Sequence, residues 1–312
     1  MIRLWRSWLE WLTEPPKPQI AFQLTSRYMS GLRVTGKDKG QNKHVVLPVD
    51  AKTLRPSFSG INILEPARLE TLLREGKDNL PINGHPVGVL LPEACQRTFV
   101  FSFSSLPRSP QEREQIIQHR IKKQMPMLAP NSRLAFYRMK AGEKERVFVA
   151  IANISVIKEY EGIFTRCGLK VGWVGVPIVG LYNVETWPTD RNVLLANLEE
   201  NSLSLLTVIG GEVVLARQKA SFLPDSGEAG ISDKMSTILQ EIENTLNFIE
   251  DQEGQTIHSL RLRLGRISDE RMVRDTLADR LDCPVEDLTV SIPSTMRPED
   301  RSLLAPLIGY LG

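Results

Sequence analysis

A set of predicted strands followed by a helix occurs twice in the chain, and this repetition restricts the fold more than any motif does. Alternating apolar residues predict strands, and apolar residues at helical spacing in 65–76 and 231–251 predict a helix after each set. The strands that precede these two helices are predicted over residues 20–24, 28–34, 44–47, 192–198, 202–209 and 212–217. The pattern alone indicates an α/β protein of two domains.

A strand–helix–strand–strand unit is inserted into the first half. Its helix begins at Ser109, where Glu112 completes a capping box. Further elements are predicted as a helix over 155–167, strands over 86–91, 98–103, 133–138, 146–154, 171–176, 257–264 and 285–290, and helices over 269–281 and 300–311. We expect a first domain over 19–190, which includes an inserted subdomain over about 92–175. The second domain covers 191–312, and its final helix either stays there or returns to the first domain.

The first 18 residues predict an amphipathic helix followed by a proline-rich linker. Three of the chain's five tryptophans share one face of this helix, and two arginines lie on the other. These residues are Trp5, Trp8 and Trp11 on the apolar face and Arg3 and Arg6 on the polar face. Such a helix suits a membrane interface, an apolar groove of a partner protein, or packing on its own domain. The residues leave all three roles open.

The composition excludes several classes of protein. A formal net charge of +2 without a basic run argues against nucleic-acid binding. The three cysteines are far apart, which predicts neither disulfides nor a metal site and fits a reducing cytoplasm. No apolar run reaches the roughly eighteen residues of a membrane span, and the N-terminal segment does not have the pattern of a signal peptide. Nucleophile-elbow, P-loop and zinc-protease motifs are also absent.

Several short segments resemble, in order and spacing, the PilM family of type IV pilus assembly proteins, relatives of the cell-division protein FtsA. The resemblance extends over most of the chain, and its strength lies in the order of the segments, because no single one is diagnostic. The matching segments are Leu106–Pro107, Gln124–Pro126, Leu134–Tyr137, Val147–Ala152, Cys167–Leu169, Glu241–Phe248 and Leu304–Leu311.

The resemblance implies an actin-like (ribonuclease H-like) fold and a cytoplasmic, non-enzymatic adaptor that is peripheral at the inner membrane. PilM-like proteins bind the cytoplasmic tail of PilN, a bitopic inner-membrane protein, and help to build the platform beneath the pilus. The cytoplasmic domain of the type II secretion protein GspL shares this fold. By analogy, the first domain with its insert is expected to offer a groove or a sheet edge to a partner peptide.

Proteins with an actin-like fold hold ATP–Mg²⁺ with two Asp-x-Gly hairpins and a glycine pair. When this chain is compared with that family pattern, it departs from it at all three places. The positions that correspond to this degenerate nucleotide site are Thr25, Ser26, Asn197, Asn201 and Gly265. Loss of both carboxylates removes the ordering of Mg²⁺, and Glu199 in place of a glycine would repel a triphosphate. We therefore predict no ATP hydrolysis, no metal site and no required cofactor. An adaptor switched by ATP is the alternative.

The adjacent carboxylates Glu199 and Glu200 could also be interpreted as an acid/base pair. Neighbouring residues on a strand point to opposite faces, which disfavours that interpretation.

Overall fold

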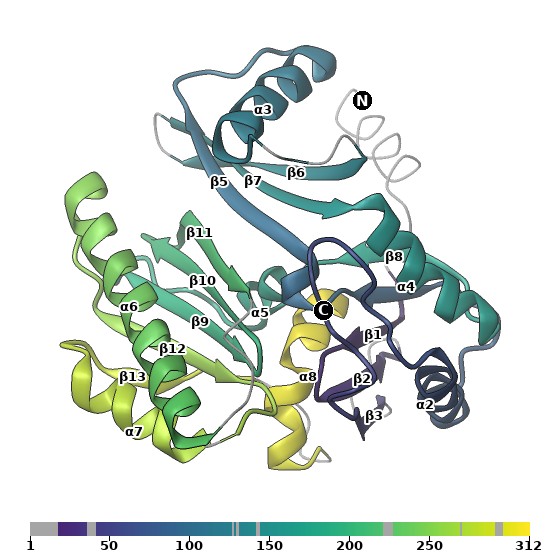
Figure 1. The fold of residues 1–312 in the computed structure, drawn as a ribbon. Coiled ribbons are helices and arrows are strands. Elements are labelled where there is room, and N and C mark those ends of the chain that lie inside the picture. The colour runs from purple at the N-terminus through teal and green to yellow at the C-terminus, as the bar shows by residue number, and fades with distance from the viewer. Residues whose placement is uncertain are drawn as a thin grey trace.

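The computed structural model describes residues 18–35, 42–126, 128, 131–141, 144–220, 227–268, 270–290 and 296–312. The predicted amphipathic helix with Trp5, Trp8, Trp11, Arg3 and Arg6 lies outside these residues. The described residues form two five-stranded sheets and one three-stranded sheet, and a C-terminal helix lies between the two large sheets (Figure 1).

The first large sheet has the strand order β3-β2-β1-β4-β8. Its strands are β1 (Ile20–Leu24), β2 (Tyr28–Arg33), β3 (Lys43–Pro48), β4 (Val87–Leu90) and β8 (Val171–Gly175). Alternate residues of β1 face opposite sides, as strand geometry requires. Phe22 packs in the core formed with helices α2 (Pro66–Asn79) and α4 (Ile154–Arg166), whereas Ala21 packs beneath α8 (Pro298–Leu311).

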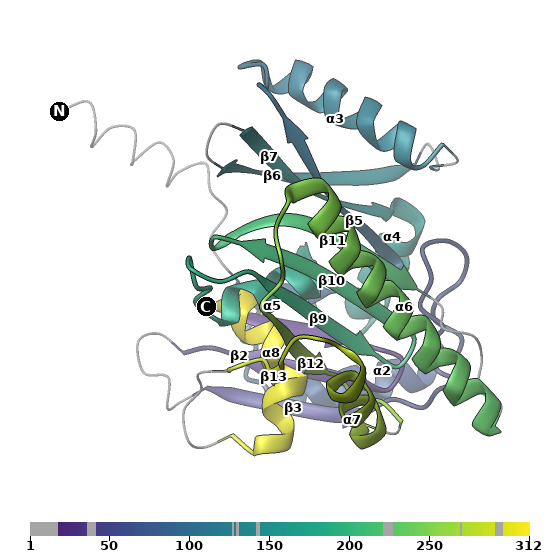
Figure 2. The same cartoon turned by 90° about the vertical axis from the view of Figure 1, so that its left-hand side faces the viewer.

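The inserted unit follows β4 and forms the three-stranded sheet β5-β7-β6. Its elements are the short 3-10 helix η2 (Glu93–Cys95), β5 (Gln96–Phe103), α3 (Pro110–Gln124), β6 (Ser132–Ala141) and β7 (Lys144–Asn153). Helix α3 lies on the outer face of this sheet, away from the second large sheet (Figure 2). Ile117 and Ile121 bury that contact against the valines of β7.

The second large sheet has the order β11-β10-β9-β12-β13. It is built from β9 (Val193–Glu199), β10 (Ser202–Ile209), β11 (Glu212–Ala220), β12 (Ser259–Leu264) and β13 (Val285–Asp287). Helices α6 (Gly227–Glu253) and α7 (Glu270–Arg280) cover one face, and α5 (Pro177–Val184) packs on the other. The long α6 crosses the outer side of the sheet (Figure 2).

Several local predictions are confirmed. The Ser109 hydroxyl accepts a hydrogen bond from the Glu112 amide and begins α3. Gly168 ends the helix before it in the left-handed region, with φ of 70°. Gly210 and Gly211, with φ of 59° and 80°, form the turn between β10 and β11. The apolar stripe of α6 faces the core as predicted.

Other local predictions need correction. Helix α2 continues to Asn79 instead of ending at Gly76. A Cβ at Gly76 would lie 2.8 Å from the terminal methyl of Met29, so this glycine provides space for the first sheet and does not stop the helix. Helix α5 was not expected, and the strand predicted over 285–290 ends at Asp287.

The crossing of α5 and α8 depends on glycines. A Cβ at Gly180 would overlap the carbonyl of Pro306, and one at Gly309 would overlap the carbonyl of Gly180. The ring of Tyr310 lies against Gly88 of β4 and Gly175 of β8 in the same way, since a Cβ at either would lie 2.7 Å from that ring. Through these contacts the C-terminal helix packs on the first large sheet, although it follows the strands of the second large sheet in the chain.

Candidate functional site

The turns at the ends of β1 and β9 meet between the two large sheets. The amide of Asn201 donates a 3.3 Å hydrogen bond to the Ser26 hydroxyl, and Arg27 donates one of 3.2 Å to Ser268. We call this boundary the seam, defined by residues 25–28, 93, 197–201 and 263–265. The seam brings together all five positions of the degenerate nucleotide site predicted from the sequence.

The hydroxyl of Thr25 is used within its own turn. It donates to the carbonyl of Tyr28 at 2.9 Å and accepts from the backbone amides of Arg27 and Tyr28 at 3.2 and 3.0 Å. This bonding stabilises the tight β1–β2 connection. The only hydroxyl proton of Thr25 is therefore engaged inside this turn.

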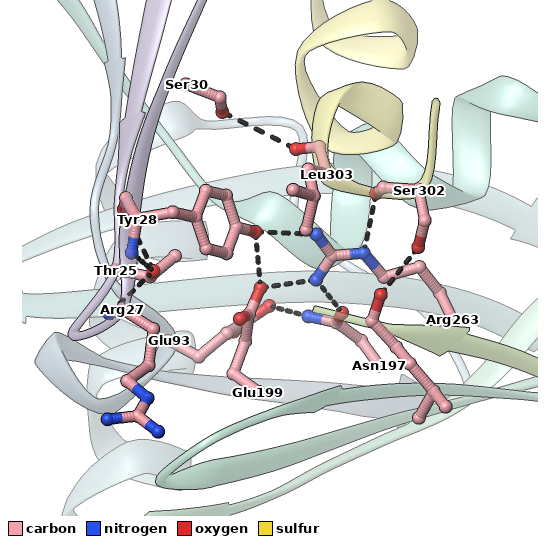
Figure 3. Close-up of polar contacts among 11 residues, drawn as sticks. Thr25, Arg27, Tyr28, Ser30, Glu93, Asn197, Glu199, Arg263, Ser302 and Leu303 are labelled. Carbon is pink, nitrogen blue, oxygen red and sulfur yellow. Dashed lines mark hydrogen bonds and ion pairs between the residues drawn. The ribbon is translucent and has the colours of Figure 1, made fainter. Parts of the chain in front are cut away.

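A buried arginine joins the two sheets at the centre of the seam (Figure 3). Arg263 is only 2% exposed and forms an ion pair with Glu199. Its guanidinium also donates to the Tyr28 hydroxyl at 2.6 Å, to the Asn197 carbonyl oxygen at 2.9 Å and to the backbone carbonyl of Ser302 at 2.9 Å. The Tyr28 hydroxyl in turn donates to Glu199 at 2.9 Å. Strand β2, strands β9 and β12, and helix α8 thus share one polar cluster.

Electrostatics keep this cluster in one charge state. Burial alone lowers the pKa of Arg263, but the Glu199 carboxylate beside it raises that pKa above its usual value. Burial also raises the pKa of Tyr28, so its hydroxyl remains a donor. The cluster therefore contains a permanent cation held by one carboxylate and a neutral phenol.

Asn197 extends the cluster to a second buried carboxyl. Its side-chain nitrogen donates to Glu93 at 3.0 Å, while its oxygen accepts from Arg263. Burial raises the pKa of Glu93 from 4.5 to about 7, and the hydrogen bond from Asn197 offsets part of that effect. Gln218 of β11 also donates to the backbone carbonyl of Glu93, which ties η2 to the second sheet.

Gly265 allows the Glu199 side chain to lie against the backbone. A Cβ at this position would overlap both carboxylate oxygens of Glu199. Glu200 points elsewhere, toward the amide of Ser268 at 2.9 Å and the ammonium of Lys234 at 3.5 Å. The two neighbouring glutamates have separate partners, in agreement with the prediction that they do not form an acid/base pair.

The seam does not fit the ATP–Mg²⁺ that actin-like folds hold at this place. The two turns that would flank the phosphates are bonded to each other, and Glu199 lies against Gly265. Both carboxylates of the second turn are already paired with cations. Among the described residues, no three His, Cys, Asp or Glu side chains are grouped to hold a metal ion.

Sequence reasoning missed Tyr28, Glu93 and Arg263 as members of the seam. One signal was available for Arg263, which alternates with leucines in Leu260–Leu264. That alternation places the leucines in the core of the second sheet and the arginine on the opposite face, which α8 covers.

A second feature is an apolar groove between the first large sheet and the insert, with a volume of about 320 Å³. One wall is β8, an edge strand that pairs only with β4 among the described strands. The other wall is the face of β6 and β7 that α3 does not cover. The groove is lined mainly by small and apolar residues: Ala135, Ala150, Ala152, Ile157, Trp173 and Val174. Arg133 and Glu161 are the charged residues of its lining.

A further apolar hollow of about 450 Å³ lies beside α5. Tyr137, Met139 and Phe148 of the insert line it together with Val179 and Tyr182 of α5. Tyr137 is 71% exposed, so a large aromatic ring stands open to solvent there. An apolar hollow with an exposed aromatic ring at its side is a candidate site of protein interaction.

Comparison with solved structures identifies the fold. A chain of the PilM–PilN type IV pilus biogenesis complex matches with a TM-score of 0.74 and 17% identity, over 95% of this chain and 97% of that chain. A Bacteroides thetaiotaomicron protein with an actin-like ATPase fold and unknown function matches with a TM-score of 0.51 and 10% identity, over 92% and 95% of the two chains.

The cytoplasmic domain of EpsL, an inner-membrane component of the Vibrio cholerae type II secretion system, also matches. Its TM-score is 0.51 at 9% identity, with 94% of each chain covered. No family model and no curated protein sequence matches this chain. The predicted actin-like α/β fold is confirmed, and the resemblance to PilM is confirmed at the level of the fold.

Proposed function

We propose that this protein is a non-catalytic adaptor of the assembly platform for type IV pili or a related secretion system. It works in the cytoplasm at the inner membrane and binds the cytoplasmic tail of a PilN-like membrane protein. The observation that supports this proposal is the groove between β8 and the insert, in a fold similar to a chain of the PilM–PilN complex. Fold likeness alone does not define function, so the groove carries the proposal.

The groove suits an extended peptide. Strand β8 contains Gly172 and Gly175, and its unpaired edge can add a strand through backbone hydrogen bonds. Small residues such as Ala135 and Ala150 leave room for apolar side chains of that peptide on the opposite wall. Arg133 and Glu161 lie in the same lining and can orient a peptide that carries charges of both signs.

The test is binding of a synthetic peptide that spans the cytoplasmic tail of the PilN-like protein from the same organism. Fluorescence of the groove residue Trp173 and calorimetry both report binding by the full chain. We expect Val174→Asp to abolish binding, because it places a charge in the apolar wall. A peptide that binds the Val174→Asp variant as tightly as the unaltered chain would exclude this groove.

Met272→Asp is the matched control. Met272 is 38% exposed and Val174 is 39% exposed, but Met272 lies on α7, outside the groove. We expect the control variant to bind the peptide with unchanged affinity. A second groove variant, Ala135→Arg, fills the groove between β8 and the insert without altering the buried core, because Ala135 is exposed. We expect both groove variants to lose binding and the Met272→Asp control to retain it.

The remaining parts of the proposal follow the sequence predictions. No helix within the described ranges combines the length and apolarity that crossing a bilayer requires. We infer that the segment with Trp5, Trp8 and Trp11 contacts the membrane or another platform protein. Binding to membranes and to platform proteins that persists after substitution of all three tryptophans by alanine would exclude that role.

We also propose the division into domains at 19–190 and 191–312.

The alternative, an adaptor switched by ATP, is separated from this proposal by thermal unfolding with and without ATP–Mg²⁺. We expect no shift in Tm, because the Glu199 carboxylate already occupies Arg263 and the two turns of the seam are bonded to each other. A rise of several degrees would favour the nucleotide-switched adaptor.

A further inference from the structure

The polar cluster of the seam has no part in the proposed peptide groove. Arg263, Glu199 and Tyr28 do not line that groove, and none of them is exposed to a partner. A buried ion pair is weak support for stability, because desolvation offsets much of the attraction between its charges. The cluster therefore requires its own explanation.

The polar cluster has the geometry of an anion in a binding pocket, in which the Glu199 carboxylate takes the place of the anion. Two groups converge on one oxygen of the Glu199 carboxylate: the guanidinium of Arg263 and the hydroxyl of Tyr28, at 2.9 Å. The backbone of Gly265 forms a further wall, since a Cβ there would overlap the carboxylate. A cation, a hydroxyl donor and a bare stretch of backbone are what a protein offers to an anionic group.

The pocket is complete only when the two large sheets are together. Tyr28 comes from the first sheet, whereas Arg263 and Glu199 come from the second. Helix α8 adds the Ser302 carbonyl, which accepts from Arg263 at 2.9 Å, and the Leu303 carbonyl, which accepts from Ser30 at 3.4 Å. Separation of the sheets would leave the charges of Arg263 and Glu199 without the Tyr28 hydroxyl between them.

We propose that Glu199 is an internal anionic ligand that fills the Arg263–Tyr28 pocket and holds the two large sheets closed without a nucleotide. In this interpretation the chain carries its own carboxylate at the boundary between the two large sheets. The proposal does not rest on the peptide groove. Peptide binding therefore tests the adaptor role separately from the experiments below.

The first experiment is chemical rescue of Glu199→Ala in the full chain. Removing the carboxylate leaves Arg263 buried and unpaired, so we expect Tm to fall by roughly 10 °C. The lost atoms correspond to acetate, and acetate at neutral pH should restore a few degrees of Tm, relative to chloride at equal ionic strength. Acetamide, the neutral analogue of similar shape, should restore none.

The double variant Glu199→Ala/Arg263→Leu is the matched control. It lacks the cation that binds the anion, so acetate should not raise its Tm. Equal rescue by acetate and acetamide would overturn the proposal, and so would rescue of the double variant. An unchanged Tm in Glu199→Ala would overturn it as well.

A second variant keeps the proposal testable where Glu199→Ala does not fold. Glu199→Gln preserves the shape of the side chain and removes its charge. We expect faster amide hydrogen exchange in residues 25–30 and 197–201, on both sides of the seam, and unchanged exchange in α3 of the insert. Exchange that is unaltered at the seam would overturn the proposal. A decrease in exchange there when the unaltered chain meets ATP–Mg²⁺ would do the same.

Discussion

Arg263, at the end of a strand in the second large sheet, donates a 2.6 Å hydrogen bond to the hydroxyl of Tyr28 in the first. The two residues are 235 positions apart in the chain and are both buried. This bond links the two large sheets of the molecule. Stability of the whole molecule therefore reports on the seam.

Tyr28→Phe should destabilise the protein by about 1–3 kcal/mol, because it leaves a buried N–H donor of Arg263 without its acceptor and removes one of the two donors to the Glu199 carboxylate. Urea unfolding measures the change, provided that the slope m stays the same. Tyr137→Phe is the control, since Tyr137 is 71% exposed and its change should be within about 0.5 kcal/mol. Equal effects in the two variants would contradict the role of the Tyr28 hydroxyl.

Glu93 should make stability decrease as pH rises. Its pKa is 4.5 when unfolded and about 7 in the folded protein, so the folded state binds more protons between these values. The free energy of unfolding therefore falls across that window, by roughly 3 kcal/mol at most from this group. Glu93→Gln stays neutral, and its stability relative to the unaltered protein should increase from pH 4.5 to 7 and then level off.

Denaturant unfolding at a series of pH values measures this difference. Glu75→Gln serves as the control, because Glu75 lies on the exposed side of α2. Its pH profile should parallel that of the unaltered protein. A Glu93→Gln profile that also runs parallel would show that Glu93 titrates alike in the folded and unfolded states.

Gly309→Ala should destabilise the protein by several kcal/mol, because the added methyl group overlaps the carbonyl of Gly180 where α8 crosses α5. The paired variant Gly162→Ala lies in α4, where the nearest contact to the new methyl group is 3.8 Å away. That substitution should stabilise by about 0.5–1 kcal/mol, as alanine does in a helix. Calorimetric Tm values of the two variants should shift in opposite directions, and shifts of the same sign would contradict the close crossing.

Cys95 should resist alkylation until the protein unfolds. Burial raises the pKa of its thiol to about 12, and the thiol lies 3.2 Å from the Asn62 side-chain oxygen. At pH 8 the thiolate population should be about a thousandfold below that of an ordinary thiol. Iodoacetamide labelling followed by peptide mapping measures this, with half-buried Cys283 as the internal comparison. Labelling of Cys95 as fast as Cys283 in the native state would refute it.

Much of the fold could be predicted because its signals are local. The cap at Ser109, the glycine end of α4 and the Gly210–Gly211 turn each depend on backbone conformation within a few residues. The apolar stripe of α6 likewise repeats within one helix. The prediction for Gly76 failed because the same residue type also provides space, and only the packing of Met29 against it shows which use applies.

The candidate site was predicted only in part. The positions of Thr25, Ser26, Asn197, Asn201 and Gly265 could be located by resemblance, and the structure does bring them to one boundary. Their partners could not be located, since Tyr28 begins a segment predicted as an ordinary strand and Glu93 lies between two predicted strands. Hydrogen bonds over more than a hundred residues leave no periodic pattern in a single sequence.

The sequence by itself determined the alternation of strands and helices in an α/β fold, and the resemblance added the positions where metal-ordering carboxylates are missing. Periodicity, caps and missing residues are properties of neighbouring positions, which one chain displays directly. Only the tertiary structure decided what Glu199 does. A carboxylate is repulsive beside a phosphate and attractive beside a guanidinium, and the approach of Arg263 gives it the attractive role.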